Sequence, residues 1–241
     1  MTFTLIDLLA LAIAVVGSTL QGMVGIGFGL LAAPLLFLID PAYVPVPVIF
    51  GGFMLSILVV SSQRHELHWR RVMPAILARI PGSYLGVLLL LAMPPHILAI
   101  VFGSSLLIAV YVSCQRFNIT ATPLNLSIGG FLSGIVGTAT SVGGPPIALV
   151  YQNETRITAR NELAAFFLIG SPLSLVLLFM EGTVTDEHMI LSLKLLPGMF
   201  IGWLLSRYLG GKLKQQSARP ALLIISAISA VMVLGKGLMA L

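Results

Sequence analysis

Residues 17–34 read GSTLQGMVGIGFGLLAAP, and residues 129–146 read GGFLSGIVGTATSVGGPP. The two stretches align at an offset of 112 residues, and the matched pairs are Gly22 with Gly134, Gly25 with Gly137, and Pro34 with Pro146. A shorter motif repeats at an offset of 116 residues: Pro81-Gly82 with Gly86, and Pro197-Gly198 with Gly202. Two such halves in one chain of 241 residues indicate an internal duplication.

The composition is typical of an integral membrane protein. Hydrophobic residues make up 58% of the chain and charged residues only 9%, with a mean hydropathy of +1.06. A soluble domain of this size carries far more charge on its surface. Six apolar runs approach the ~20 residues that cross a bilayer as a helix, and they cover 44–62, 72–92, 96–114, 163–180, 189–209 and 220–241.

Two further apolar stretches, 5–38 and 124–151, are too long for one simple span, and the Gly-rich motif interrupts each of them at its centre. We therefore expect each stretch to form a hairpin of a broken helix. The first stretch has no basic leader and no obvious small-residue cleavage site, so we expect it to be part of the fold rather than a signal peptide.

The Lys and Arg residues cluster in alternate connections: Arg64, Arg70, Arg71; Arg116; Arg156, Arg160; Arg207, Lys212, Lys214, Arg219. The connections around 39–43, 93–95 and 181–188 hold neither Lys nor Arg. The positive-inside rule places the basic loops in the cytoplasm. That placement requires the stretch 124–151 to enter and leave the membrane on the cytoplasmic side. The stretch 5–38 must likewise enter and leave on the outer side, and both termini then lie outside.

The predicted fold is therefore an all-α polytopic membrane protein with two inverted-topology repeats in one integral membrane domain. The first repeat covers 1–118 and the second covers 119–241. Each repeat contains one Gly-rich hairpin followed by three transmembrane helices, with the bounds given above. This architecture is typical of secondary transporters, whose site lies between the repeats.

The hairpins are the first candidates for a ligand site, because the arm that leaves each break begins with unpaired N–H groups that favour an anion. The candidate substrate-binding residues are Gln21, Gly22, Gly25 and Gly27 in the first half, and Ser133, Gly137, Thr138, Thr140, Ser141 and Gly143 in the second. The alternative is that the small residues only let helices pack closely, with no ligand involved.

Two cations within predicted spans are the second set of candidates. Arg79 lies just before Pro81-Gly82, and Lys194 lies just before Pro197-Gly198, so the two cations occupy nearly equivalent places in the two halves. A charge within a span is costly and usually faces an interior, so both are predicted to bind substrate; snorkelling to the interface is the alternative. Pro81, Gly82, Pro197 and Gly198 are predicted hinge or gating points, because Pro-Gly steps bend helices.

Other chemistry finds little support in the sequence. His65, Glu66 and His68 have ligand-like spacing but lie in an Arg-rich loop, so no metal or other cofactor is predicted. There is no nucleotide-binding P-loop and no hydrolase pattern, so the chain is not expected to be an enzyme. The single cysteine, Cys114, allows no intrachain disulfide. The pI of about 9.7 reflects the basic loops and does not indicate nucleic acid.

These motifs together resemble those of the TauE/SafE family of membrane permeases, the sulfite exporter family. The resemblance rests on GMVGIGFGLLAAPLL, on GIVGTATSVGGPPIALVY and on the two PG-x-x-x-G steps, and it covers nearly the whole chain. It implies a secondary transporter that moves a small sulfur-containing anion, such as sulfite, sulfoacetate or thiosulfate, or another organic acid. The resemblance implies export or uptake by secondary transport without ATP. We expect export across a bacterial inner membrane, by alternating access at a midplane site between the two hairpins.

Several alternatives remain open at this point. One alternative is an anion channel with the same fold, which would need the same polar path. Another is a protein that is not a transporter, either a membrane-embedded enzyme or an accessory scaffold. Asp7, Glu162 and Glu181 all lie near predicted span ends, which favours facilitated or potential-driven flux over coupling through a midplane carboxylate. The expected partners are the anion and the lipid bilayer, and a homodimer is left open.

Overall fold

The computed structural model describes residues 4–24, 28–62, 67–115, 119–209 and 215–241. These residues form ten α-helices and no strand, which confirms the predicted all-α class. In chain order the elements are α1 (Leu5–Val24), the π-helical turn η1 (Phe28–Ala32), α2 (Ala33–Ile39), the 3₁₀ turn η2 (Pro41–Tyr43), α3 (Val46–Ser62), α4 (Trp69–Ala92), α5 (Pro95–Cys114), α6 (Pro123–Thr140), α7 (Gly144–Val150), α8 (Arg156–Met180), α9 (Asp186–Leu209) and α10 (Gln215–Leu238).

The long helices have the length and composition of membrane spans. Within the described residues, six helices are both long enough and apolar enough to cross a bilayer, and they include α3, α4, α5, α8 and α9. Large apolar side chains point outward along them, for example Leu77, Ile108, Val176 and Phe200. Lipid tolerates such a surface and water does not. The chain is therefore a multi-pass membrane protein.

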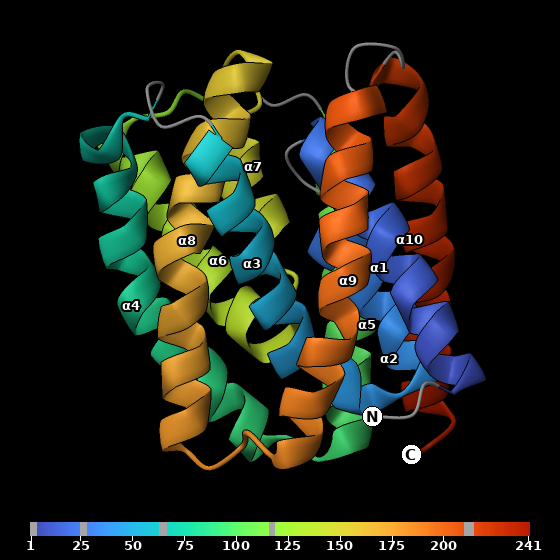
Figure 1. Cartoon of the computed structure of the whole chain (residues 1–241). Helices are drawn as coiled ribbons and strands as arrows, with labels where there is room; N and C mark the ends of the chain where they lie inside the picture. Colours follow the sequence, from blue (N-terminus) through green and yellow to red (C-terminus); the bar gives the residue numbers. More distant parts are fainter. Residues whose placement is uncertain (1–3, 25–27, 63–66, 116–118, 210–214) are drawn as a thin grey trace.

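Each of the two long apolar stretches forms a long helix followed by a short one. In the first, α1 precedes η1 and α2; in the second, α6 precedes α7 (Figure 1). Ser141 ends α6 in the left-handed conformation with φ 67°, and no other non-glycine residue in the described ranges has a positive φ. This conformation turns the chain sharply, so that α7 starts at Gly144 and runs back beside α6.

The ends of the bundle differ in charge. In Figure 1, α1 begins and α10 ends at the lower end, where the turn between α8 and α9 also lies. That turn carries Glu181, and α9 begins with Asp186 and Glu187. The upper end holds the first turn of α4, with Arg70 and Arg71, and the last turn of α9, with Arg207.

Close helix crossings explain the repeated PG-x-x-x-G steps. A Cβ on Gly86 would lie 2.6 Å from the Ile135 carbonyl oxygen, so α4 and α6 pack backbone to backbone. A Cβ on Gly198 would lie 2.7 Å from the Leu11 carbonyl oxygen, so α9 packs against α1 in the same way. Only glycine allows such an approach.

The helix contacts fall into corresponding pairs when the two halves are exchanged. The contact of α4 with α6 corresponds to that of α9 with α1, and the contact of α5 with α7 corresponds to that of α10 with α2. The pairs α3 with α8 and α5 with α10 each join equivalent helices. In Figure 1, α1 and α9 run upward side by side, whereas α4 and α6 run downward.

Two buried apolar clusters each join helices of both repeats. One gathers residues of α1, η1, α2, α5, α9 and α10 around Phe28, Leu36 and Phe102. The other gathers residues of α4, α6, α7 and α8 around Ile147 and Phe166. Phe28 in the first cluster and Phe166 in the second both lie close to the polar centre described next.

Candidate functional site

A small cavity lies where the two hairpins meet. Its volume is about 50 Å³, and its walls come from both hairpins and from α3, α4 and α8. Five of the residues predicted from sequence line it: Gln21, Arg79, Gly137, Ser141 and Gly143. The space would hold about three to five waters, so it suits an ion of a few heavy atoms.

The hairpin tips contact each other beside this cavity. A Cβ on Gly29 would lie only 2.6 Å from the carbonyl oxygen of Ser141, so the two breaks meet backbone to backbone. The Ser141 hydroxyl donates a hydrogen bond of 2.9 Å to the Pro45 carbonyl oxygen, which ties the second tip to the start of α3. The cavity is thus enclosed by backbone from both halves of the chain.

Two equivalent polar side chains hold the hairpins in shape. Gln21 and Ser133 occupy matched positions in the 112-residue alignment. The Gln21 Oε1 atom accepts a hydrogen bond of 2.9 Å from the Phe28 N–H, across the first break. The Ser133 hydroxyl donates one of 2.5 Å to the Gly143 carbonyl oxygen, across the second. Both side chains therefore set the backbone that lines the cavity.

Arg79 supplies the charge of the site. Its side chain comes from the middle of α4 and is only 2% exposed, the largest fully buried side chain in the described structure. Its guanidinium donates long hydrogen bonds to the hydroxyls of Ser133, at 3.4 Å, and Ser174, at 3.3 Å. The rings of Phe166 and Phe167 lie 4.9 and 5.3 Å from its central carbon. Cation–π contact with these rings partly replaces lost hydration.

No carboxylate in the described ranges pairs with Arg79, and its Nε atom has no hydrogen-bond partner there. A buried charge is costly unless an opposite charge and hydrogen bonds accompany it. Two phenylalanines and two neutral hydroxyls supply neither a counter-charge nor full hydrogen bonding. The arrangement therefore favours an anion in the adjoining cavity.

The family model described as "Sulfite exporter TauE/SafE" matches residues 9–233 of this chain, which is nearly its whole length. The chain belongs to this family. Membership confirms the resemblance noted in the sequence and implies a membrane transporter of sulfur-containing anions such as sulfite. Comparisons with curated proteins and with solved structures found no match.

Lys194 of this TauE/SafE protein lies apart from the cavity. Its Nζ atom is 2.8 Å from Oδ2 of Asp7, and the two side chains are 16% and 5% exposed. This pair links α9 to the first turns of α1. The two cations that the sequence placed in equivalent positions thus have different surroundings, since Lys194 has a carboxylate partner and the described partners of Arg79 are neutral.

We expect Lys194→Met to lower stability and to leave anion affinity unchanged. Breaking a fully buried pair costs about 3–5 kcal/mol, and the partial exposure of Lys194 puts the expected loss near the lower end, at about 3 kcal/mol. Thermal unfolding in detergent, with and without sulfite, measures both effects. The double variant with Asp7→Asn should recover most of the loss, because it removes the stranded carboxylate. Weakened anion binding with intact stability would instead place Lys194 in the substrate path.

The remaining predicted substrate residues are spread around the cavity. Thr138 shares a hydrogen bond of 2.8 Å with Ser174, one of the Arg79 partners. The Thr140 hydroxyl donates to the Val136 carbonyl oxygen at 2.7 Å, within its own helix. Gly22 packs on Ser206 and lines a second cavity of about 100 Å³. Gly25 and Gly27 lie outside the described residues.

The second cavity lies toward the basic end of the bundle. Besides Gly22 and Ser206 it is lined by Ser62 and by two arginines, Arg160 and Arg207. The Arg207 guanidinium lies 5.2 Å from the Trp203 ring. This cavity is therefore polar and basic, and adjacent residues of α1 line the two cavities: Gln21 the central one and Gly22 the second.

The Pro-Gly steps do not interrupt their helices in this conformation. α4 continues through Pro81 and α9 continues through Pro197. Gly82 packs on the backbone of Phe131, and Gly198 packs on that of Leu11. Close packing is thus the role visible for these glycines, and hinge motion at the four predicted positions stays a prediction.

Several lining residues escaped the sequence reasoning. Phe28 and Gly29 lie within the quoted first motif and could have been found as neighbours of its break. Phe167 and Ser171 come from α8, where no motif marks them. Gly170 belongs with them, because its missing side chain makes room for the Arg79 stem. The described residues contain no group of three or more His, Cys, Asp or Glu that could hold a metal ion.

Proposed function

We propose that the protein is a secondary transporter that binds one small oxyanion, sulfite or a close analogue, in the central cavity beside Arg79. The buried guanidinium carries this proposal, because it has neither a carboxylate partner nor a full set of hydrogen bonds within the described structure. Gly29 and Gly143 bring main-chain groups to the same cavity from opposite hairpins. α7 has only seven residues, so its dipole adds little and the arginine supplies most of the attraction.

The size of the cavity favours the smallest members of the substrate class. A volume of about 50 Å³ suits sulfite, which is a single central atom with its oxygens, and also thiosulfate. Sulfoacetate is longer and needs the cavity to widen. The walls also contain Phe28, Val48, Ile49 and Phe167, which exclude water and strengthen the attraction between the anion and Arg79.

The pairing of helix contacts supports two inverted repeats that work by alternating access. α1 with α9 and α6 with α4 are equivalent pairs that run in opposite directions. A site between such repeats opens to either face when one bundle rocks against the other. The Pro-Gly steps of α4 and α9 lie along these paired contacts and remain the proposed hinge points.

The charge distribution supports an orientation with the basic end in the cytoplasm and both termini outside. The second cavity, with Arg160 and Arg207, then lies on the inner approach to the site and raises the local concentration of anions there. In a bacterial inner membrane an inside-negative potential favours anion exit by about 2.3 kcal/mol per charge per 100 mV. Export is the proposed direction.

Uptake of labelled sulfite into proteoliposomes tests this function. We expect saturable uptake with trans-stimulation by unlabelled sulfite inside, as a carrier gives. Sulfite and thiosulfate should compete more strongly than sulfoacetate, and lactate least. Unsaturable flux without trans-stimulation would indicate a channel. Absence of sulfite uptake and of all competition, from protein shown to be folded, would overturn the substrate assignment.

A further inference from the structure

A buried carboxylate near the basic end is unused by the site described above. Glu162 lies in the second turn of α8, and its side chain is 0% exposed. Among the described residues neither of its carboxylate oxygens has a hydrogen-bond partner of normal geometry, and the hydroxyl of Tyr151, which acts on this carboxyl, likewise has none. The sequence placed Glu162 near a span end, where solvent would reach it. The structure differs because α8 begins at 156 and the end of α7, with Tyr151, covers this turn.

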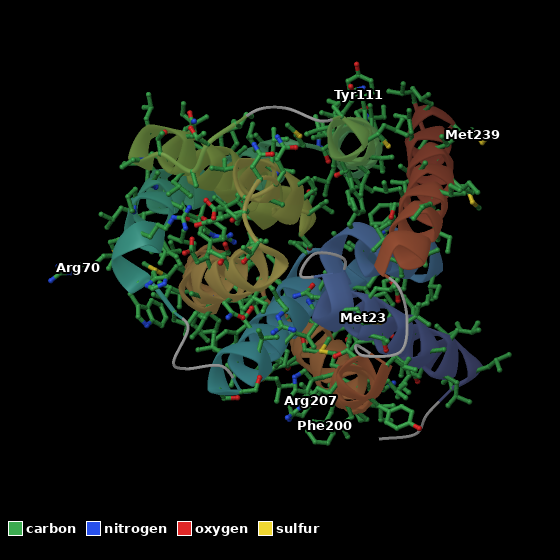
Figure 2. All side chains as sticks on the ribbon, turned by 90° about the horizontal axis from the view of Figure 1, so that it is seen from above. Met23, Arg70, Tyr111, Phe200, Arg207 and Met239 are labelled. Atoms are coloured by element: carbon green, nitrogen blue, oxygen red, sulfur yellow. The ribbon has the colours of Figure 1, made fainter. Side chains whose placement is uncertain are left out.

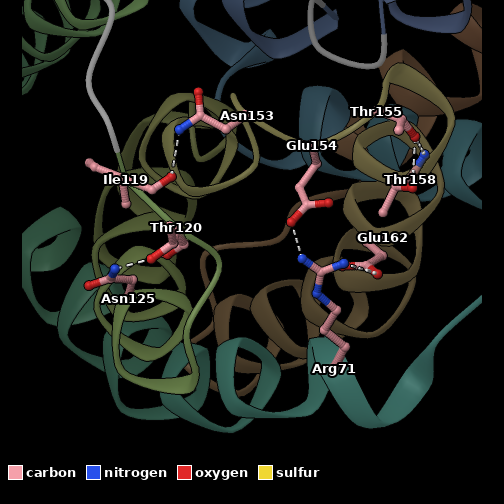
Figure 3. A network of polar contacts seen from close by, with 9 residues as sticks. All are labelled: Arg71, Ile119, Thr120, Asn125, Asn153, Glu154, Thr155, Thr158 and Glu162. Atoms are coloured by element: carbon pink, nitrogen blue, oxygen red, sulfur yellow. Dashed lines mark hydrogen bonds and ion pairs between the residues drawn. The ribbon is translucent and has the colours of Figure 1, made fainter.

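The neighbouring charges do not neutralise Glu162 completely. Its nearest cation is Arg71 of α4, whose Nη1 atom lies 3.5 Å from Oε1 of Glu162. The other nitrogen of the same guanidinium, Nη2, bonds to Glu154, in the turn after α7 (Figure 3). Two carboxylates thus share one arginine. Tyr151 and His68 are the other titratable groups that act on Glu162.

Protonation would remove the excess charge of this cluster. With both carboxylates ionised, the three side chains carry a net negative charge, and the 3.5 Å contact with Arg71 is the ion pair that the described structure gives the buried member. Taking up one proton makes Glu162 neutral and leaves Arg71 paired with Glu154. Burial of an unsatisfied carboxylate favours this neutral form.

The cluster is joined to the anion site through the same two helices. Phe166 follows Glu162 by one turn of α8, so the two lie on one face, and Phe166 contacts the Arg79 guanidinium. Arg71 precedes Arg79 by eight residues of α4, which is about 12 Å along the helix. A negative ion beside Arg79 repels the ionised form of Glu162 and so favours its protonation.

We propose that Glu162 is a proton-binding site of the transporter, and that one proton and the anion bind and move together. This inference rests on the proposed anion transport. The carboxylate takes its proton from the aqueous phase, becomes a carboxylic acid while the anion is bound, and returns the proton when the anion leaves. The cotransported proton lowers the charge moved with each anion by one, so a divalent anion leaves as one net negative charge that the membrane potential still drives outward, and the rate depends on pH.

Glu162→Gln tests the coupling, because glutamine has the shape of the protonated acid and cannot release a proton. The probe is labelled thiosulfate, which carries no titratable proton near neutral pH, and a pH dye inside proteoliposomes reports proton movement. We expect the wild type to move protons in step with thiosulfate. The variant should retain thiosulfate exchange and lose nearly all of the accompanying proton movement, and its rate should no longer depend on pH.

Two other glutamates provide matched controls. Glu181→Gln changes an exposed carboxyl at the far end of α8 and should keep the proton-to-anion ratio of the wild type. Glu154→Gln removes the second carboxylate on Arg71 and with it the excess negative charge, so proton coupling should persist but shift to lower pH. Loss of proton coupling at every pH in Glu154→Gln but not in Glu162→Gln would mean that Glu154 binds the proton, and would overturn the proposal.

Infrared difference spectra of the membrane-reconstituted protein test proton binding without transport. The wild type should show a protonated carboxyl band that titrates with pH and that is missing in Glu162→Gln. A band unchanged in the variant, or equal proton-to-thiosulfate ratios in both proteins, would overturn the inference. A wild type that shows the band but moves no anion would instead contradict the proposed function and leave the proton site standing.

Discussion

Arg79→Gln is expected to abolish anion transport while the protein remains folded. Arg79 is the buried cation of the central cavity, and the anion is its missing counter-charge. Removing one partner of a buried ion pair costs about 3–5 kcal/mol, which corresponds to a loss of about a hundredfold or more in affinity. Sulfite uptake into proteoliposomes and sulfite-dependent thermal stabilisation in detergent both measure the effect.

The stability of the same variant in the absence of anion should not fall, and it is expected to rise slightly. The wild type buries a charge whose partners in the described structure are neutral, and the neutral amide of glutamine lowers that cost. Arg70→Gln is the matched control, since Arg70 comes from the same helix and points away from the bundle (Figure 2). It removes the same charge and should leave uptake near that of the wild type. Undiminished uptake by Arg79→Gln would remove this arginine from the mechanism.

Gly29→Ala is expected to reduce uptake through geometry alone. The added methyl group would lie 2.6 Å from the Ser141 carbonyl oxygen, which is backbone and cannot turn aside. The two hairpin tips must therefore separate, and strain of this kind costs about 1–3 kcal/mol. A corresponding loss of about fivefold to a hundredfold in anion affinity is expected, measured as sulfite competition against labelled sulfite.

Gly235→Ala serves as the control for Gly29→Ala. It introduces the same methyl group into α10, where, beyond the helix's own neighbouring backbone, no atom of a described residue lies within 4 Å of the new Cβ position. Affinity should be unchanged, with at most a small gain in stability, because alanine favours the helix. Equal affinities of the two alanine variants would mean that contact between the hairpin tips does not shape the site.

Much of the fold was predictable because its signals are local. Hydropathy located the long helices, with ends that differ from the structure by several residues where polar turns continue a helix, as at the start of α8. The Gly-rich motifs located both breaks, since a sharp turn at membrane depth needs residues such as Gly143 that bring backbone close to backbone. The same reasoning predicted which hairpins supply the cavity walls.

The different surroundings of Arg79 and Lys194 were not predictable from their positions in the sequence. Arg79 and Lys194 occupy nearly equivalent positions, but their surroundings depend on helix contacts distant in sequence. α1 brings Asp7 to Lys194, whereas α8 brings Phe166 and Phe167 to Arg79. The sequence around Phe166 contains no repeated motif, so nothing marked it as a neighbour of a cation. The burial of Glu162 was not predicted for a related reason, because it depends on how the end of α7 packs against α8.

Crystals soaked with selenite, a heavier analogue of sulfite, would test the position of the anion most directly. An anomalous difference map should show one selenium peak in the cavity between Arg79, Gly29 and Gly143, within hydrogen-bond reach of the guanidinium. The peak should be absent from crystals of Arg79→Gln. A peak at Lys194, or at Arg160 and Arg207 with none beside Arg79, would contradict the central site.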